Sequence, residues 1–228
     1  MIAPVPGGQL PAALLFDLDG TLLDSAPDLA IAVNRVLFDL GYCAVTEESV
    51  RSWVGNGAHK LVGRALAHAQ GLSESVVEPQ QLVDALNRFM EHYQHCCCGR
   101  SQLYPGVLEA LAYWREEGVA MACVTNKPAR FTDQLLEYFG LSAFITVSVS
   151  GDSLPQKKPA PEPLFHACEQ LAVNPSAALM IGDSINDVQA ARAAGMAVVC
   201  VDYGYNYGEP IASALPDRVI ASLAELIS

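Results

Sequence analysis

The sequence Ala13-Leu14-Leu15-Phe16-Asp17-Leu18-Asp19-Gly20-Thr21 changes character abruptly in its middle. Its first four residues are apolar and are typical of a buried strand. The residues that follow bring two acids, a glycine and a threonine, which are typical of a loop. This change indicates that something other than packing uses the end of the strand.

Residues 25–102 contain no second strand of comparable quality. Apolar side chains recur there at steps of three and four residues, as at Leu29, Val33, Val36, Leu37 and Leu40, and similar patterns occupy 58–69 and 82–93. Such spacing is typical of amphipathic helices. The segment is therefore predicted to be helical.

Beyond Tyr104-Pro105-Gly106 the sequence alternates between helical and strand-like stretches. Helices are predicted at about 107–117, 129–139, 162–171 and 187–194, strands at 119–124, 144–149, 178–181 and 197–201, and a short strand and helix at the end. This alternation is typical of a parallel sheet with right-handed helical crossovers. We therefore predict an α/β fold with a Rossmann-like parallel sheet core.

The strand at 13–16 then finds parallel partners only after residue 118, which makes the helical segment an insertion. Residues 1–24 and 103–228 are predicted to form the α/β catalytic core, and residues 25–102 an inserted helical cap. Length alone does not decide this, because 228 residues fit either one large α/β domain or a core that carries a smaller insertion.

The composition and the net charge of the chain indicate which classes of binding partner are not expected. The formal net charge is −12, and because nucleic acid and anionic membranes repel an acidic chain, neither is expected as the main partner. No stretch reaches the roughly 18 to 20 uninterrupted apolar residues that a membrane helix needs. Residues 1–8 lack the basic and long apolar regions of a secretory signal and resemble a flexible leader, so the cytoplasm is the expected location.

The seven cysteines form no paired C-x-x-C spacing, and their odd number favours reduced thiols. Cys123 and Cys200 lie in apolar runs and are expected to be buried as small hydrophobic residues. Cys96, Cys97 and Cys98 are consecutive, and three adjacent thiols cannot all point at one metal ion from a regular helix. No function is assigned to them.

Polar residues follow four of the predicted strands. They are Asp17 and Asp19, Thr125 and Asn126, Lys157 and Lys158, and Asp183 and Asp187. Because open parallel sheets bind ligands at the carboxyl ends of their strands, these side chains are expected to lie together. Each one alone fits a turn, a helix cap or a solvated charge equally well. Their occurrence at successive strand ends favours a single site.

Several carboxylates at one edge of a sheet repel one another unless a hard cation lies among them, and oxygen ligands favour Mg²⁺. A carboxylate with a free oxygen can attack phosphorus, while the metal, a hydroxyl and a lysine hold the phosphoryl oxygens. The pattern therefore predicts a Mg²⁺-dependent phosphoryl-transfer centre.

These residues resemble the motifs of the haloacid dehalogenase superfamily of phosphohydrolases. The first motif is matched by residues 17–21, the second by Thr125, the third by Lys158-Pro159, and the fourth by Gly182-Asp183-Ser184 with Asp187. The resemblance implies that Asp17 is the nucleophile and a metal ligand. It also implies that Asp19 is the general acid and base, with its backbone carbonyl on the metal.

The resemblance further implies that Thr125 and Asn126 bind the phosphoryl group, that Lys158 neutralises it, and that Asp183 completes the metal site with support from Asp187. Lys157 is a rival for the role of the lysine. Lys158 is preferred because it directly precedes a proline, as in the family pattern. The second acid, Asp19, favours a phosphatase over a dehalogenase, since the dehalogenases of this superfamily lack it.

The closer likeness is to bacterial phosphoglycolate phosphatases, through residues 54–58, 151–159 and 203–206. It implies hydrolysis of a small phosphorylated metabolite, 2-phosphoglycolate, to glycolate. Gly55, Asn56 and Gly57 are predicted to form a tight turn in the cap that selects a small carboxylate with backbone donors, or that simply joins two helices. One alternative is a phosphatase of the same mechanism for a sugar phosphate or nucleotide, and a second is a non-catalytic phosphometabolite-binding module.

Overall fold

The computed structural model describes residues 10–227, so the leader expected over residues 1–8 lies outside the described part of the chain. The strands are β1 (Ala13–Phe16), β2 (Leu23–Asp24), β3 (Gln102–Leu103), β4 (Ala120–Val124), β5 (Val147–Val149), β6 (Ala178–Gly182), β7 (Ala197–Val201) and β8 (Arg218–Ile220). The helices are α1 (Ala26–Asp39), α2 (Glu47–Arg51), α3 (Ala58–Gln70), α4 (Pro79–Gln94), α5 (Val107–Glu116), α6 (Ala129–Tyr138), α7 (Glu162–Gln170) and α8 (Ile185–Ala193). Within residues 10–227 no helix is long and apolar enough to cross a membrane.

The core is a six-stranded sheet in the order β5-β4-β1-β6-β7-β8, and every neighbouring pair runs parallel. The first strand lies inside the sheet, where Ala13 is paired with Ala120 on one side and with Ala178 on the other. This arrangement confirms the prediction that β1 finds its partners only after residue 118. Two parallel neighbours also bring the carboxyl ends of β1, β4 and β6 to the same edge of the sheet.

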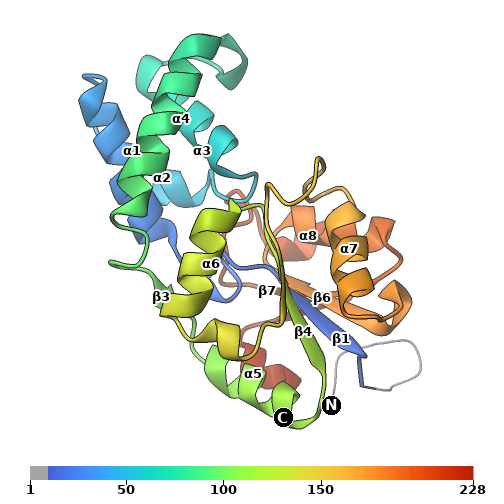
Figure 1. The fold of residues 1–228 in the computed structure, drawn as a ribbon. Coiled ribbons are helices and arrows are strands. Elements are labelled where there is room, and N and C mark those ends of the chain that lie inside the picture. The colour runs from blue at the N-terminus through green and yellow to red at the C-terminus, as the bar shows by residue number, and fades with distance from the viewer. Residues whose placement is uncertain (1–9, 228) are drawn as a thin grey trace.

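Helices cover both faces of the sheet, and the alternation of side chains along β1 explains why. Leu14 and Phe16 pack into a cluster with residues of α5 and α6, whereas Ala13 and Leu15 pack into another with α7 and α8. Figure 1 shows these two pairs of helices on opposite sides of the sheet. A strand buried on both faces needs apolar residues at every position, as β1 has. The α/β Rossmann-like core is confirmed.

Helices α1 to α4 form a group of their own to one side of the sheet (Figure 1). They share a hydrophobic cluster that includes Val33, Leu37, Leu66 and Phe89. The chain passes between the sheet and these helices through the short antiparallel pair β2 and β3, with Leu23 opposite Leu103. We call residues 25–102 the helical segment.

Three local features differ from the elements predicted from the sequence. The strand expected at 144–149 is reduced to β5, because the Leu141 carbonyl accepts the backbone N–H groups of Phe144 and Ile145 and holds those residues in a turn. The helix expected from Asp187 begins two residues earlier, at Ile185. Helix α2 has no predicted counterpart, since five residues are too few to show helical periodicity.

Candidate active site

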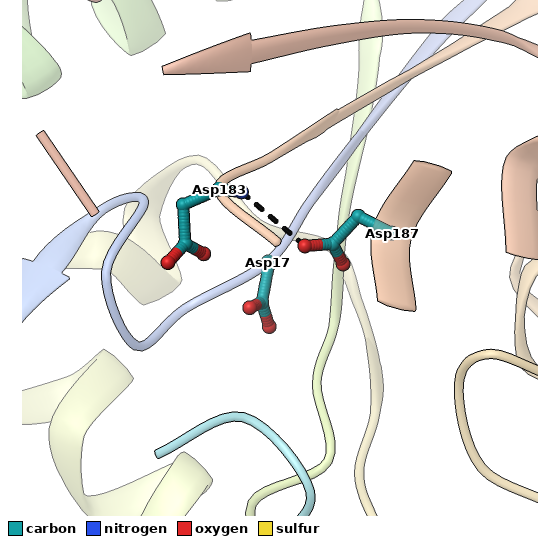
Figure 2. A group of neighbouring side chains, drawn as sticks. All are labelled: Asp17, Asp183 and Asp187. Atoms are coloured by element: carbon teal, nitrogen blue, oxygen red, sulfur yellow. Dashed lines mark hydrogen bonds between the residues drawn. The ribbon is translucent and has the colours of Figure 1, made fainter. Parts of the chain in front are cut away.

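Three buried carboxylates meet where β1 and β6 end. Asp17 directly follows β1, Asp183 directly follows β6, and Asp187 lies in the first turn of α8. One oxygen of each lies within 4.8 Å of the corresponding oxygens of the other two. Figure 2 shows the three side chains gathered from these separate segments. The prediction that acids at strand ends converge is confirmed for these three residues.

Lys158 supplies positive charge inside this cluster. Its Nζ atom lies 2.9 Å from Asp17 Oδ1 and 2.7 Å from Asp187 Oδ1, and the lysine itself is only 4% exposed. Burial acts to lower the pKa of Lys158, but the two carboxylates outweigh it and raise that pKa above its ordinary value. Lys157, the rival in the sequence, is exposed. The structure therefore brings Lys158, and not Lys157, to the carboxylates.

Asp183 is held from two sides by groups far away in the sequence. The Thr21 hydroxyl donates to Asp183 Oδ1 at 3.0 Å, and the backbone N–H of Tyr205 donates to Asp183 Oδ2 at 2.7 Å. A methyl group added at Gly20 or at Gly204 would overlap the Asp183 side chain, so glycine is required at both positions. The position of this carboxylate is thus fixed before any ligand binds.

Asp187 has no oxygen left free. Its Oδ2 accepts the backbone N–H groups of Asp183 and Ser184 at 3.2 and 3.1 Å and the Ser184 hydroxyl at 3.0 Å, while its Oδ1 faces Lys158. These contacts close the first turn of α8 and orient the lysine. They fit a supporting residue better than a primary metal ligand.

The cluster has the electrostatics of a cation site. Burial is the largest influence on Asp17, and although Lys158 opposes it, the pKa of this carboxyl rises from 3.8 to about 6. Burial and the neighbouring Asp17 and Asp187 likewise raise the pKa of Asp183. In addition, Asp17 Oδ1 is buried and accepts no well-aligned hydrogen bond from the described residues. A hard cation between Asp17 and Asp183 would stabilise both ionised carboxylates.

Asp19 lies two residues beyond Asp17, and its carboxylate is held apart from the other three. Lys127 Nζ donates to both of its oxygens, at 2.8 and 2.9 Å, and the Ser25 hydroxyl donates to Oδ1. The sequence analysis did not single out Lys127. The available signal was its place immediately after Thr125 and Asn126, at the end of β4.

Thr125 and Asn126 follow β4 as expected, and both are buried. The Thr125 hydroxyl accepts the backbone N–H of Lys127 at 3.3 Å. The Asn126 amide donates to the carbonyls of Gly55 at 2.8 Å and Lys158 at 2.9 Å. Its side chain therefore joins the helical segment and the Lys158 loop to the end of β4.

The predicted turn at Gly55, Asn56 and Gly57 lies against the sheet edge. Gly55 and Gly57 have positive φ values of 121° and 83°, which favour glycine, and the Gly55 carbonyl also accepts the Asn186 amide at 3.2 Å. Together with Asp17, Asp19 and Thr125, this turn lines a cavity of about 40 Å³. The sequence analysis missed Asn186, which clamps the turn from the first part of α8.

The remaining wall of the cavity is apolar and comes mainly from the helical segment. It consists of Leu29, Val54, Leu61, Phe89, Tyr93 and Phe131, the last from α6. A volume of this size holds about three water molecules. The cavity therefore fits a small chemical group of a ligand that binds beside Asp17.

Comparisons with known proteins agree with this geometry. A phosphoglycolate phosphatase of Nitrosococcus oceani is 45% identical over 216 residues, which cover 95% of each chain. Another, of Pseudomonas savastanoi pv. phaseolicola, is 48% identical over 222 residues, which cover 96% of this chain and 80% of that one. The crystal structure of a predicted phosphoglycolate phosphatase from Haemophilus somnus superimposes with a TM-score of 0.91 at 37% identity, and the match covers 97% of this chain and 98% of that chain.

The model of the family described as haloacid dehalogenase-like hydrolase matches residues 14–201. This range contains Asp17, Thr125 and Asp183, which directly follow strands, and Lys158, which lies in the loop after β5. The chain belongs to the haloacid dehalogenase-like hydrolase family.

Proposed function

We propose that this chain is a Mg²⁺-dependent phosphatase that hydrolyses 2-phosphoglycolate to glycolate through an aspartyl-phosphate on Asp17. The observation that carries the proposal is the cluster of Asp17, Asp183 and Lys158, with Asp19 beside it at the mouth of the small cavity. The substrate is suggested by the names of the relatives reported above, which are 45% and 48% identical to this chain over the matched residues.

In the proposed reaction, an oxygen of Asp17 attacks phosphorus and displaces the alcohol oxygen of the substrate. Asp19 gives its proton to that leaving oxygen and then takes a proton from the water that hydrolyses the aspartyl-phosphate. The Thr125 hydroxyl and the backbone N–H of Asn126 are proposed to bind the phosphoryl oxygens, and Lys158 to balance their charge.

Asp17, Asp183 and the backbone carbonyl of Asp19 would hold the Mg²⁺, and Asp187 would support them. When bound, the cation supplies positive charge to the phosphoryl oxygens and separates the carboxylates electrostatically. Mg²⁺ prefers oxygen ligands and is usually held by one or two carboxylates, and Asp17 and Asp183 offer oxygens within 4.8 Å of each other.

The helical segment is proposed to act as a cap on a core made of residues 1–24 and 103–228. Its Gly55-Asn56-Gly57 turn lines the cavity, and its own hydrophobic cluster lets it move as a unit. The cap then excludes water and selects the leaving group. A cytoplasmic location and a small-molecule partner in place of nucleic acid or membrane remain predictions that rest on the sequence.

The test is phosphate release from 2-phosphoglycolate, several sugar phosphates and several nucleotides, with Mg²⁺ present and then chelated. We expect a preference for 2-phosphoglycolate that disappears on chelation and in Asp17→Asn. A preference for another phosphate would keep the mechanism and overturn the substrate. No release from any of them would contradict the proposal and favour a binding module.

A further inference from the structure

Lys127 is a buried lysine at the mouth of the cavity. It is 5% exposed, its Nζ atom contacts both oxygens of Asp19, and the same atom lies 4.9 Å from the centre of the Tyr93 ring. A lysine is rarely buried without a partner, because its charge loses hydration. Asp19 is that partner in the structure, and the ion pair places the Lys127 ammonium group beside the cavity.

Lys127 is the only positively charged residue among the described residues that line the cavity. Lys158 faces Asp17 and Asp187 on the side of the phosphoryl group. An anionic part of a substrate that enters the cavity therefore meets positive charge at Lys127.

The place of the leaving group follows from the role of Asp19. The oxygen that Asp19 protonates belongs to the leaving alcohol, so the rest of that alcohol begins beside Asp19 and extends into the cavity. In a two-carbon acid the carboxylate carbon is bonded directly to the carbon that carries this oxygen, so it lies only two bonds from the leaving oxygen. An ammonium group that touches Asp19 is thus within reach of that carboxylate.

The hydroxyl of Tyr93 adds an independent observation. Tyr93 belongs to α4 and lines the same cavity, and its buried hydroxyl has no hydrogen-bond partner among residues 10–227. A buried donor without an acceptor is unfavourable, and such groups in native proteins call for an explanation such as a ligand. A carboxylate bound by Lys127 would offer the missing acceptor.

We propose that Lys127 is the residue that selects a carboxylated leaving group by binding its carboxylate, with the Tyr93 hydroxyl as a second donor. This inference rests on the proposed function.

The experiment compares 2-phosphoglycolate with 2-hydroxyethyl phosphate, in which a hydroxymethyl group replaces the carboxylate. Both are measured as kcat/KM in the wild type and in Lys127→Met. In the variant we expect kcat/KM for 2-phosphoglycolate to fall about 10- to 100-fold more than kcat/KM for 2-hydroxyethyl phosphate. This is the size of effect expected when a hydrogen bond between charged groups is lost. An effect of Lys127 that acts only through Asp19 lowers both values equally and cancels in their ratio.

Three further variants sharpen the result. Lys127→Gln retains a donor to Asp19 without the charge and serves if the methionine variant does not fold. Tyr93→Phe removes only the hydroxyl and is expected to lower the ratio severalfold. Arg115→Met removes an exposed cation from α5, outside the cavity lining, and is expected to leave the ratio unchanged.

The outcomes separate this inference from the proposed function. If the wild type prefers 2-phosphoglycolate and both neutral Lys127 variants keep the same preference, Lys127 does not recognise the carboxylate. The inference about Lys127 is then wrong, and the proposed function stands. If the wild type shows no preference for 2-phosphoglycolate, the proposed substrate fails, and the selection assigned to Lys127 fails with it.

Discussion

Lys158 Nζ lies 2.9 Å from Oδ1 of Asp17, and this ion pair joins the loop before α7 to the end of β1. It holds in place the carboxylate that is proposed to attack phosphorus. Because both residues are buried, neither charge is screened by water as it would be at the surface. The ion pair therefore both orients the Asp17 side chain and stabilises its negative charge.

Lys158→Met should lower kcat strongly. The substitution removes the positive charge that faces both Asp17 and the phosphoryl group, and loss of one such stabilising group typically costs about 100- to 1,000-fold. Steady-state phosphate release measures the effect, and Lys157→Met, an exposed neighbour, is the matched control. Equal activity of the two variants would show that the buried lysine has no part in the reaction.

Asp19→Ala should bind substrate and turn it over slowly. The change removes the proposed proton donor, whose contribution is typically about 100- to 10,000-fold. The residual turnover should be least impaired for an aryl phosphate, because its leaving oxygen needs little help from an acid. Comparison of kcat for an aryl and an alkyl phosphate checks this, and unchanged kcat for the alkyl phosphate would reject the role.

The sequence predicted those parts of the fold and site that depend on local pattern. The strand at 13–16 and its acid at position 17 could be found because burial and polarity change within a few residues. Asp183 stands at the end of a predicted strand and Lys158 in the loop after another, and the topology of a parallel sheet brings such positions together. The family resemblance added their proposed roles, and the family itself is confirmed by the match over residues 14–201.

Contacts between distant segments had no such signal. Lys127 meets Asp19 across 108 positions, and Asn186 meets the Gly55 carbonyl across 131. Neither contact produces a periodic pattern in the sequence from which it could be predicted. Asn126 shows the same limit, since the sequence placed it at the site but gave no indication that its amide would bind two backbone carbonyls.

Asn186→Ala should weaken the closed arrangement of the helical segment. The Asn186 amide holds the Gly55 carbonyl and also contacts the Tyr207 hydroxyl. One hydrogen bond contributes about 1 kcal/mol, so the ratio of closed to open forms should fall about fivefold, and the apparent affinity falls with the fraction of closed protein. KM should rise more than kcat falls, whereas Asn174→Ala, at an exposed turn, should change neither. An unaltered KM would mean that the contact does not control closure.

The stability of the metal-free protein should depend on pH through Asp17. Its pKa is raised from 3.8 to about 6 in the folded chain, so the folded state binds more protons than the unfolded state between these values. The contribution of Asp17 to stability is therefore fully present below pH 4 and is lost as the pH rises through 6.

Urea unfolding in the presence of a chelator tests this dependence by comparing the wild type with Asp17→Asn, which cannot ionise. The variant should be the more stable protein at pH 7, and its advantage should shrink as the pH falls from 6 to 4. A difference that stays constant across this range would contradict the assigned shift.

The central claim is that the phosphoryl group passes through Asp17, and trapping the intermediate tests it most directly. Asp19→Ala is mixed with an aryl phosphate and Mg²⁺, quenched in acid within one turnover, digested, and analysed by mass spectrometry. The aryl leaving group needs little help from an acid, so the aspartyl-phosphate still forms, whereas loss of the base slows its hydrolysis and should let it accumulate. We predict one added phosphoryl group on the peptide that contains Asp17, and none in the variant that also carries Asp17→Asn. Release of phosphate with no modified peptide at any quench time, or modification at another residue, would contradict the account.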